Sequence, residues 1–149
     1  MDDKDTQIIT ILQKNAQMSV KDIARQLKLS YTATFMRINK LEREDVIRKY
    51  TVDVDSKKLN RNLSAIVTIR VDQYKSSATA DREKLIMLPE VERIDFVSGE
   101  WDILIWASFR DMEHLKDFLQ YILPKALGNA TRNQTMLVLE SVRKAPEMI

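Results

Sequence analysis

The hydrophobic residues of this chain recur at two different spacings, and the change from one to the other divides the chain into two parts. Up to Glu44 the apolar side chains return every three or four residues, which is the spacing of amphipathic helices. After Glu44 they alternate or gather in short runs rich in β-branched residues, which is typical of strands. The sequence therefore predicts a helical first part and a mixed α and β second part.

Three short helices are predicted in the first part. They are a helix from Asp5, its expected N-cap, to Lys14, a helix over residues 20–27 capped by Ser19, and a helix capped by Ser30. The last two are separated only by Lys28 and Leu29, and Ala24 allows them to approach closely. This pattern favours a helix-turn-helix over its alternative, a plain three-helix bundle that binds no DNA.

The third helix has two faces of different chemistry. Thr34, Ile38 and Leu41 form an apolar stripe at i, i+4 and i+7. The side chains off this stripe are mostly hydrogen-bonding or cationic groups, where a helix without a ligand more often carries Glu, Lys and Gln. The residues expected to bind DNA are Ser30, Tyr31, Thr32, Met36, Arg37 and Lys40.

These residues suit different parts of the duplex. Ser30 can offer its hydroxyl or the helix N-terminus to a phosphate, and Tyr31, Thr32 and Met36 can reach base edges. Arg37 and Lys40 suit phosphate or guanine, although Arg37 could equally be a structural arginine that bonds across the domain. For Phe35, packing against a neighbouring helix is favoured over contact with the groove, because large aromatic side chains are mostly buried.

The second part is predicted to fold as βαββαβ, the ferredoxin-like arrangement. A strand over residues 46–54 and a polar connector precede it, and its expected elements are a strand at 63–72, a helix at 76–88, strands at 91–98 and 102–109, a helix at 111–127 and a strand at 131–143. The fold class is thus α+β. The predicted domains are a helix-turn-helix, winged-helix-like domain over 1–50, a linker strand and connector over 51–62, and a βαββαβ domain over 63–149.

Composition excludes several classes of protein. No cysteine is present, which rules out disulfides, thiolate zinc sites and cysteine nucleophiles. The longest apolar runs, such as 103–107, are too short to span a bilayer, and the acidic start has no secretory signal, so we expect a cytoplasmic protein that does not bind membranes. Residues 1–62 hold 13 Lys and Arg against 9 Asp and Glu, a modestly basic balance compatible with DNA.

No catalytic or metal-binding constellation is evident, and no cofactor is expected. The one histidine, His114, is expected on the exposed side of its helix next to Glu113. The sequence shows no Ser/His/Asp set, no glycine-rich phosphate loop and no metal-ligand spacing. The sequence therefore does not favour an enzyme.

Taken in order and spacing, the motifs of this chain resemble the Lrp/AsnC, or feast/famine, transcriptional regulators. The matching residues are Asp2, Asp5, Ile8, Ile9 and Leu12; Ser19, Ile23, Ala24, Leu27, Leu29 and Ser30; Arg37, Ile38, Leu41, Glu42, Val46, Ile47 and Tyr50; Pro89 and Val91; Gly99, Trp101 and Asp102; Thr135, Val138, Leu139 and Glu140. The chain departs from the family at Lys28 and Asp45, where glycine is usual. An altered exit from the third helix is expected at Asp45.

The resemblance implies a DNA-binding first domain and a second domain that forms dimers and senses a small molecule, usually an amino acid. Family dimers form through their sheets, often assemble into octamers, and bind the effector near the loop that Gly99, Trp101 and Asp102 match. By that likeness Gly99 would allow backbone approach, Trp101 would supply an apolar wall and Asp102 would pair with an amino group. Alternatively, Gly99 and Asp102 are turn residues and Trp101 belongs to a dimer interface.

Two other functions remain open at this point. One is a sensor that keeps the sheet domain but does not bind DNA. The other is an enzyme subunit similar to the AsnC-like sirohaem decarboxylases. The expected function is a sequence-specific transcriptional regulator that binds pseudo-palindromic double-stranded DNA as a dimer or higher oligomer.

Overall fold

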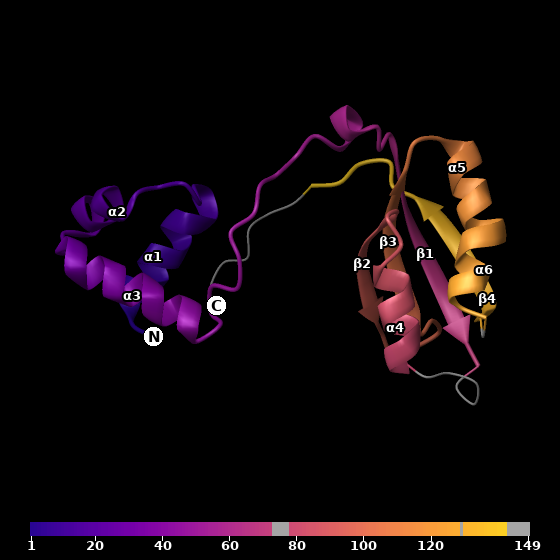
Figure 1. Cartoon of the computed structure of the whole chain (residues 1–149), viewed down its shortest axis with the longest axis horizontal. Helices are drawn as coiled ribbons and strands as arrows, with labels where there is room; N and C mark the ends of the chain where they lie inside the picture. The colour runs from indigo at the N-terminus through magenta and orange to yellow at the C-terminus, as the bar shows by residue number, and fades with distance from the viewer. Residues whose placement is uncertain (73–77, 129, 143–149) are drawn as a thin grey trace. The chain divides into compact units, whose positions relative to one another are not determined.

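The computed structural model describes residues 1–72, 78–128 and 130–142, which form two compact units (Figure 1). The first centres on Met1–Asp53 and the second covers Val54–Ser141. The division between them lies within the segment predicted as a linker.

The first unit is built from three helices. They are α1 (Asp3–Lys14), α2 (Val20–Leu27) and α3 (Tyr31–Arg43). The predicted apolar stripe of α3 is confirmed, because Thr34, Ile38 and Leu41 are all buried. Ile38 and Leu41 belong to the small core of this unit, and its other members are Ile8, Ile11, Ile23 and Leu27. The buried area of this core, rather than helix propensity, holds three such short helices together.

The cap of α1 differs from the prediction. Asp2, not Asp5, is the N-cap, and its carboxylate accepts hydrogen bonds from the backbone N–H groups of Lys4 and Asp5. Asp5 is the third residue of the helix and its carboxylate accepts a bond from the Asp2 N–H in return. This reciprocal pair satisfies free N–H groups at both positions, which a cap at Asp5 would leave unpaired.

Helices α2 and α3 end in the same way, with a residue in the left-handed conformation. Lys28 has φ 55° and Asp45 has φ 54°. After α2 the N–H of Leu29 donates to the Ala24 carbonyl, and after α3 the N–H of Val46 donates to the Leu41 carbonyl. Both are Schellman motifs. The altered exit expected at Asp45 is therefore wrong, because aspartate takes the conformation that glycine adopts more easily.

The predicted strand over residues 46–54 is also wrong for this chain. Residues 48–55 form neither helix nor strand, and they lead into a short 3-10 helix, η1 (Ser56–Leu59). Val52 is 73% exposed. The alternating apolar pattern is present, but a strand needs hydrogen bonds from a neighbouring strand, and the described chain places none beside it.

The second unit has the predicted βαββαβ order. Its elements are β1 (Leu63–Val71), α4 (Ala78–Ile86), β2 (Val91–Phe96), β3 (Ile103–Phe109), α5 (Met112–Asp117), a π-helical turn η2 (Phe118–Ile122), α6 (Leu123–Ala126) and β4 (Ala130–Leu137). The sheet is antiparallel with strand order β2-β3-β1-β4. The last strand ends at Leu137 instead of continuing toward residue 143. Residues 76, 77 and 143 of the predicted elements lie outside the described residues.

The two faces of this sheet have different surroundings. Inward residues of β1 and β3 pack with Leu85 of α4 and with Leu115, Phe118, Leu123 and Leu127. The helices thus cover one face, as Figure 1 shows. On the other face the strand register places Met136, Ile66 and Trp106 side by side across β4, β1 and β3. Trp106 and Ile66 are half-buried and Met136 is exposed, so this face carries apolar side chains that the described chain does not cover.

Candidate nucleic-acid interface

Helix α3 presents one continuous exposed face. Thr32, Met36, Asn39, Lys40 and Arg43 are exposed, and their spacing of three or four residues places them opposite the buried stripe. The structure therefore brings Thr32, Met36 and Lys40, three of the predicted DNA-binding residues, to one side of the first unit. A helix exposed along one face is the shape that enters a major groove.

Ser30 is occupied in holding the start of α3. Its side-chain oxygen accepts a hydrogen bond from the Ala33 N–H at 3.1 Å, and its carbonyl accepts from the Thr34 N–H. The N–H groups of Tyr31 and Thr32 precede the first intrahelical bond. These two N–H groups are therefore available to an anion, whereas the serine oxygen already accepts a hydrogen bond.

Tyr31 and Phe35 form a stacked pair. Their ring centroids are 6.2 Å apart with an interplanar angle of 6°, and the side chains are 57% and 43% exposed. The expectation that Phe35 packs against a neighbouring helix is wrong. It lies four residues after Tyr31 on the same helix, at the border of the apolar stripe, and it stacks on that ring instead of entering the core.

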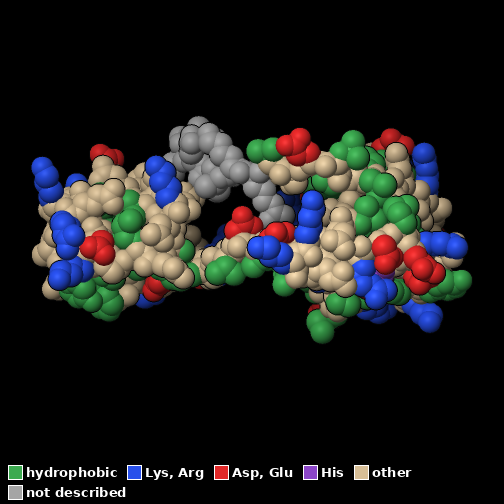
Figure 2. All heavy atoms as spheres, turned by 90° about the horizontal axis from the view of Figure 1, so that it is seen from above, with side chains coloured by type: hydrophobic (Ala, Val, Ile, Leu, Met, Phe, Trp, Pro, Cys, Tyr) green, Lys and Arg blue, Asp and Glu red, His purple; other side chains and the backbone are tan. Residues whose placement is uncertain are grey.

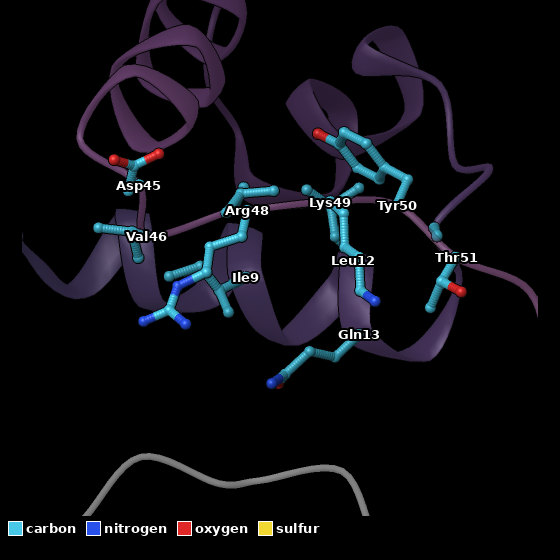
Figure 3. Close-up of a pocket in the computed structure, with 11 residues that line it drawn as sticks. Ile9, Leu12, Gln13, Asp45, Val46, Arg48, Lys49, Tyr50 and Thr51 are labelled. Carbon is cyan, nitrogen blue, oxygen red and sulfur yellow. The ribbon is translucent and has the colours of Figure 1, made fainter. Parts of the chain in front are cut away.

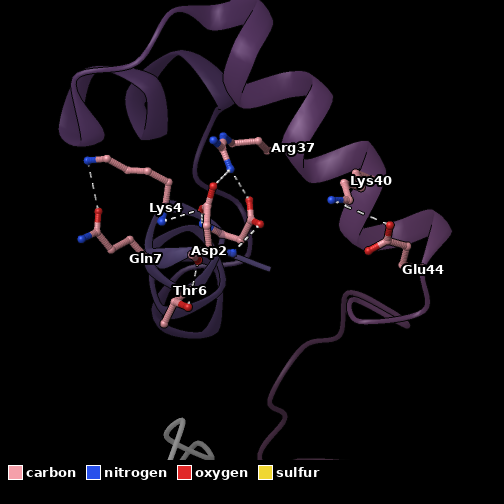
Figure 4. Close-up of polar contacts among 8 residues, drawn as sticks. Asp2, Lys4, Thr6, Gln7, Arg37, Lys40 and Glu44 are labelled. Carbon is pink, nitrogen blue, oxygen red and sulfur yellow. Dashed lines mark hydrogen bonds and ion pairs between the residues drawn. The ribbon is translucent and has the colours of Figure 1, made fainter.

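Arg37 bonds within the first unit. Its Nη1 atom lies 2.7 Å from the Asp2 Oδ2 and 2.7 Å from the Asp5 Oδ1 (Figure 4). The backbone N–H of Asp5 and the Arg37 guanidinium hold the pKa of Asp2 below its usual value. Burial raises the pKa of Asp5, but the Asp2 N–H and Arg37 outweigh it and leave that pKa lowered. The same contacts raise the pKa of Arg37, so this group stays a cation bound to two anions.

A shallow hollow of about 510 Å³ joins this ion-pair cluster to the exposed face of α3. Met36, Arg37 and Lys40 line it together with Met1, Asp2, Asp5 and Arg43. Lys40 makes a loose ion pair with Glu44 at 4.0 Å, and both side chains are about half exposed. Such a pair contributes little to stability, so Lys40 can be redirected toward a phosphate at small cost.

Cationic side chains surround this helix rather than forming one dense patch. Figure 2 shows Lys and Arg side chains at separate points over the visible face of the first unit. Lys28 and Arg43 are exposed and make no ion pair with the described residues. This arrangement suits a partner whose negative charges are spaced along a surface, as phosphates are along DNA.

Another groove of the first unit lies away from the exposed face of α3. It has a volume of about 620 Å³ and runs between α1 and residues 45–51, with Ile9, Leu12 and Val46 among its lining residues (Figure 3). Tyr50 also lines it and donates a hydrogen bond to Glu42 at 2.8 Å. Burial and this carboxylate raise the pKa of Tyr50 to about 12. None of the predicted DNA-binding residues lies in this groove.

The second predicted site is the turn from β2 to β3. Gly99 has φ 126°, a conformation that L side chains rarely adopt. Apart from Gly99 and its two chain neighbours, no atom of the described residues lies within 4 Å of the place its Cβ would take. The Asp102 carboxylate accepts a hydrogen bond from the Val71 N–H at 2.9 Å, so it also ties the turn to β1. Trp101 is half-buried, and the guanidinium of Arg132 lies 5.0 Å from its ring centroid.

His114 is placed differently from the prediction. It is half-buried, and its Nε2 lies 2.9 Å from Oε1 of the buried Glu90. The helix after Asp111 turns this side chain toward the end of β3, where its ring also meets Phe109 edge-on. The histidine therefore has a bonding partner inside the sheet unit.

Metal binding and membrane insertion also bear on function. Within residues 1–72, 78–128 and 130–142, no group of three or more His, Asp or Glu could hold a metal ion. Over the same ranges, no helix has both the length and the apolar character needed to cross a membrane.

Two family descriptions match the chain, one for each unit. The winged helix-turn-helix DNA-binding family matches residues 1–48, and the Lrp/AsnC ligand-binding domain matches residues 64–148. The chain belongs to the Lrp/AsnC family. It is accordingly a helix-turn-helix DNA-binding transcriptional regulator with a ligand-binding domain, as the resemblance predicted.

Individual relatives match over nearly their full length. The HTH-type transcriptional regulator FL11 of Pyrococcus furiosus is 28% identical over 99% of this chain and 95% of its own. An AsnC family transcriptional regulator from Agrobacterium tumefaciens is 26% identical, with a TM-score of 0.88 over 100% of this chain and 97% of its own. A Neisseria meningitidis regulator solved with L-methionine shares the fold, with a TM-score of 0.90, 22% identity and coverage of 100% and 96%.

Proposed function

We propose that this regulator binds a pseudo-palindromic operator as a twofold dimer in the cytoplasm, and that an amino acid bound by its second unit modulates that binding. The exposed face of α3 is the observation that carries the DNA part of the proposal. A twofold dimer presents two such helices about one turn of DNA, roughly 34 Å, or a multiple of it apart.

Within the interface the residues take separate roles. Tyr31, Thr32 and Met36 contact base edges, because they occupy the exposed first two turns of α3. The N-terminal N–H groups of α3, positioned by the Ser30 cap, and Lys40 contact phosphates. Arg37 holds α3 against the start of α1 through Asp2 and Asp5 instead of contacting DNA directly.

The uncovered sheet face supports the dimer. Ile66, Trp106 and Met136 form an apolar row there, and covering such a row with the same row of a second copy buries apolar area in a twofold arrangement. Further assembly to an octamer follows the family resemblance.

The turn between β2 and β3 supports an effector site. Asp102 offers a carboxylate for an ammonium group, Trp101 offers an apolar wall, and the space beside Gly99 is open. L-Methionine is a reasonable first probe, because the Neisseria regulator was solved with it. An effector that binds one assembly state more tightly shifts the balance between states, and with it the spacing of the DNA-binding units.

The test is selection of bound fragments from random duplex DNA by the purified full chain at two salt concentrations. We expect a recovered palindrome, with log affinity falling by about 0.9 per phosphate contact for each unit of log salt. Lys40→Ala lowers this slope by about one, whereas Lys125→Ala, a matched exposed lysine on α6, leaves it unchanged. Weak binding without a recovered sequence would overturn the proposal.

A further inference from the structure

Two exposed aromatic rings lie beside the exposed face of α3, near the start of the helix. Tyr31 and Phe35 are stacked nearly parallel and are both about half exposed. Neither belongs to the buried cluster of the first unit nor to the hydrophobic residues packed against it. The buried residues of the same helix are instead Thr34, Ile38 and Leu41.

An apolar surface of this kind indicates a contact with a partner. Aromatic rings offer large contact areas, and exposing two of them side by side forgoes the stabilisation that burial would give. The pair adjoins Thr32 and Met36, which belong to the face proposed to contact base edges. The pair therefore lies beside the surface that is proposed to meet the duplex.

The side chains of the first two turns of α3 limit which base these turns can recognise. Their exposed side chains are Tyr31, Thr32, Phe35 and Met36, and no acidic residue lies in the first turn. Carboxylates are the usual acceptors for cytosine N4, and amide side chains are the usual partners of adenine, so neither base has its customary partner in these turns. Only thymine presents an apolar group, its C5 methyl, in the major groove.

We propose that the stacked Tyr31–Phe35 pair selects thymine in each operator half-site by packing against its C5 methyl group. This inference rests on the proposed function, because it presumes that α3 enters the major groove. The two rings are nearly parallel on the same helix surface, so both offer apolar area to the methyl group, and Tyr31 keeps the base-edge role proposed above. Thr32 and Met36 complete the edge of the contact.

The test removes single methyl groups from the DNA and leaves the protein intact. Each thymine of the selected operator is replaced in turn by deoxyuridine, which keeps base pairing and O4 and lacks only the methyl. Binding is measured by fluorescence anisotropy. We expect one or two positions per half-site at which the replacement weakens binding about fourfold, the effect of one buried methyl group.

Variants then assign the effect to the pair. Phe35→Ala should bind thymine and deoxyuridine operators equally at those positions, and Phe35→Leu should retain part of the difference. Tyr121→Ala is the matched control, because Tyr121 is 60% exposed and lies in η2 of the second unit. It should keep the full difference.

The possible results distinguish failure of this inference from failure of the proposed function. A specific operator that binds equally well with deoxyuridine at every position would overturn the thymine contact and leave the proposed function unaffected. A methyl effect that survives Phe35→Ala would also overturn it. If Phe35→Ala instead changes the sedimentation of the free protein and not the methyl effect, the rings form a protein contact and the inference fails. Failure to recover any operator would overturn both proposals.

Discussion

The Nη1 atom of Arg37 lies 2.7 Å from a carboxylate oxygen of Asp2 and 2.7 Å from one of Asp5. Asp2 is the N-cap of α1, and Asp5 is only 4% exposed. One cation therefore links the start of the first helix to the middle of the third, two elements that are more than thirty residues apart in the chain. This link ties α3 to the start of α1.

Replacing Arg37 by alanine should lower the free energy of unfolding of the first unit by about 2 kcal/mol, because the buried Asp5 carboxylate loses its cation. Operator affinity should fall while the slope of log affinity against log salt stays unchanged. Lys40→Ala should show the opposite pattern, with a smaller slope and nearly normal stability. A slope reduced by about one in Arg37→Ala would mean that Arg37 contacts a phosphate.

The same cluster predicts a dependence of stability on pH. The pKa values of Asp2 and Asp5 lie below their ordinary value of 3.8 in the folded protein. Their contribution to stability is therefore complete above that value and is lost as the pH falls through the lowered values. We expect the free energy of unfolding of the first unit to stay constant between pH 7 and about pH 5 and to decline below pH 3.8. The amide NMR signals of Ile8 and Ile38 follow it.

Asp5→Asn is the control for this pH dependence. It should be less stable at neutral pH and should lose less stability on acidification, because the residue that titrates has been removed. Equal acid sensitivity in both proteins would show that other carboxylates cause the decline.

Lys28 and Asp45, the residues with positive φ after α2 and α3, are sites where substitution should stabilise the protein. Lys28→Gly and Asp45→Gly should each raise the free energy of unfolding of the first unit by about 1 kcal/mol, because glycine adopts positive φ without the clash of a Cβ atom. Urea unfolding followed by circular dichroism measures this gain. Lys28→Ala serves as the control, since alanine keeps the Cβ. A similar gain in the alanine variant would show that loss of the lysine charge is the cause.

The apolar row on the open sheet face predicts the site of self-association. Ile66→Glu places a charge between Trp106 and Met136 and should convert the proposed dimer to a monomer in sedimentation velocity. Operator affinity should fall by at least tenfold, because two linked half-site contacts become one. Leu139→Glu is the control, since Leu139 is 98% exposed and lies beyond the end of β4. A dimer that survives Ile66→Glu would place the interface elsewhere.

Periodicity was sufficient to predict most of the fold. The stripe of Thr34, Ile38 and Leu41 and the βαββαβ order both follow from spacing, because burial of one face imposes that spacing on helices and strands. It was insufficient at residues 46–54, where Val52 and Val54 alternate as in a strand. Pairing depends on a partner strand that local sequence does not specify.

The site was harder to predict than the fold because roles depend on contacts distant in sequence. Arg37 has the same spacing as a DNA-facing residue, and only the folded chain shows Asp2 and Asp5 beside it. For Phe35, its large aromatic ring and its place at the border of the apolar stripe both favour packing against a neighbouring helix. The signal that could have placed it correctly is its i, i+4 spacing from Tyr31, which predicts a ring pair on the same helix surface.

Asp102 offers the last prediction, on effector binding. Its carboxylate accepts a hydrogen bond from the Val71 N–H, and asparagine in its place can still accept that bond through its side-chain oxygen. Asp102→Asn should therefore keep the melting temperature while weakening the binding of an amino acid by roughly tenfold or more, because only the charge facing the ammonium group is lost. Calorimetric titration with L-methionine measures the affinity, and Glu113→Gln, an exposed acidic residue of α5, is the matched control. Equal affinity in the wild-type and Asp102→Asn proteins would assign Asp102 to the turn alone, whereas a lower melting temperature with unchanged affinity would show that the charge serves the Val71 contact.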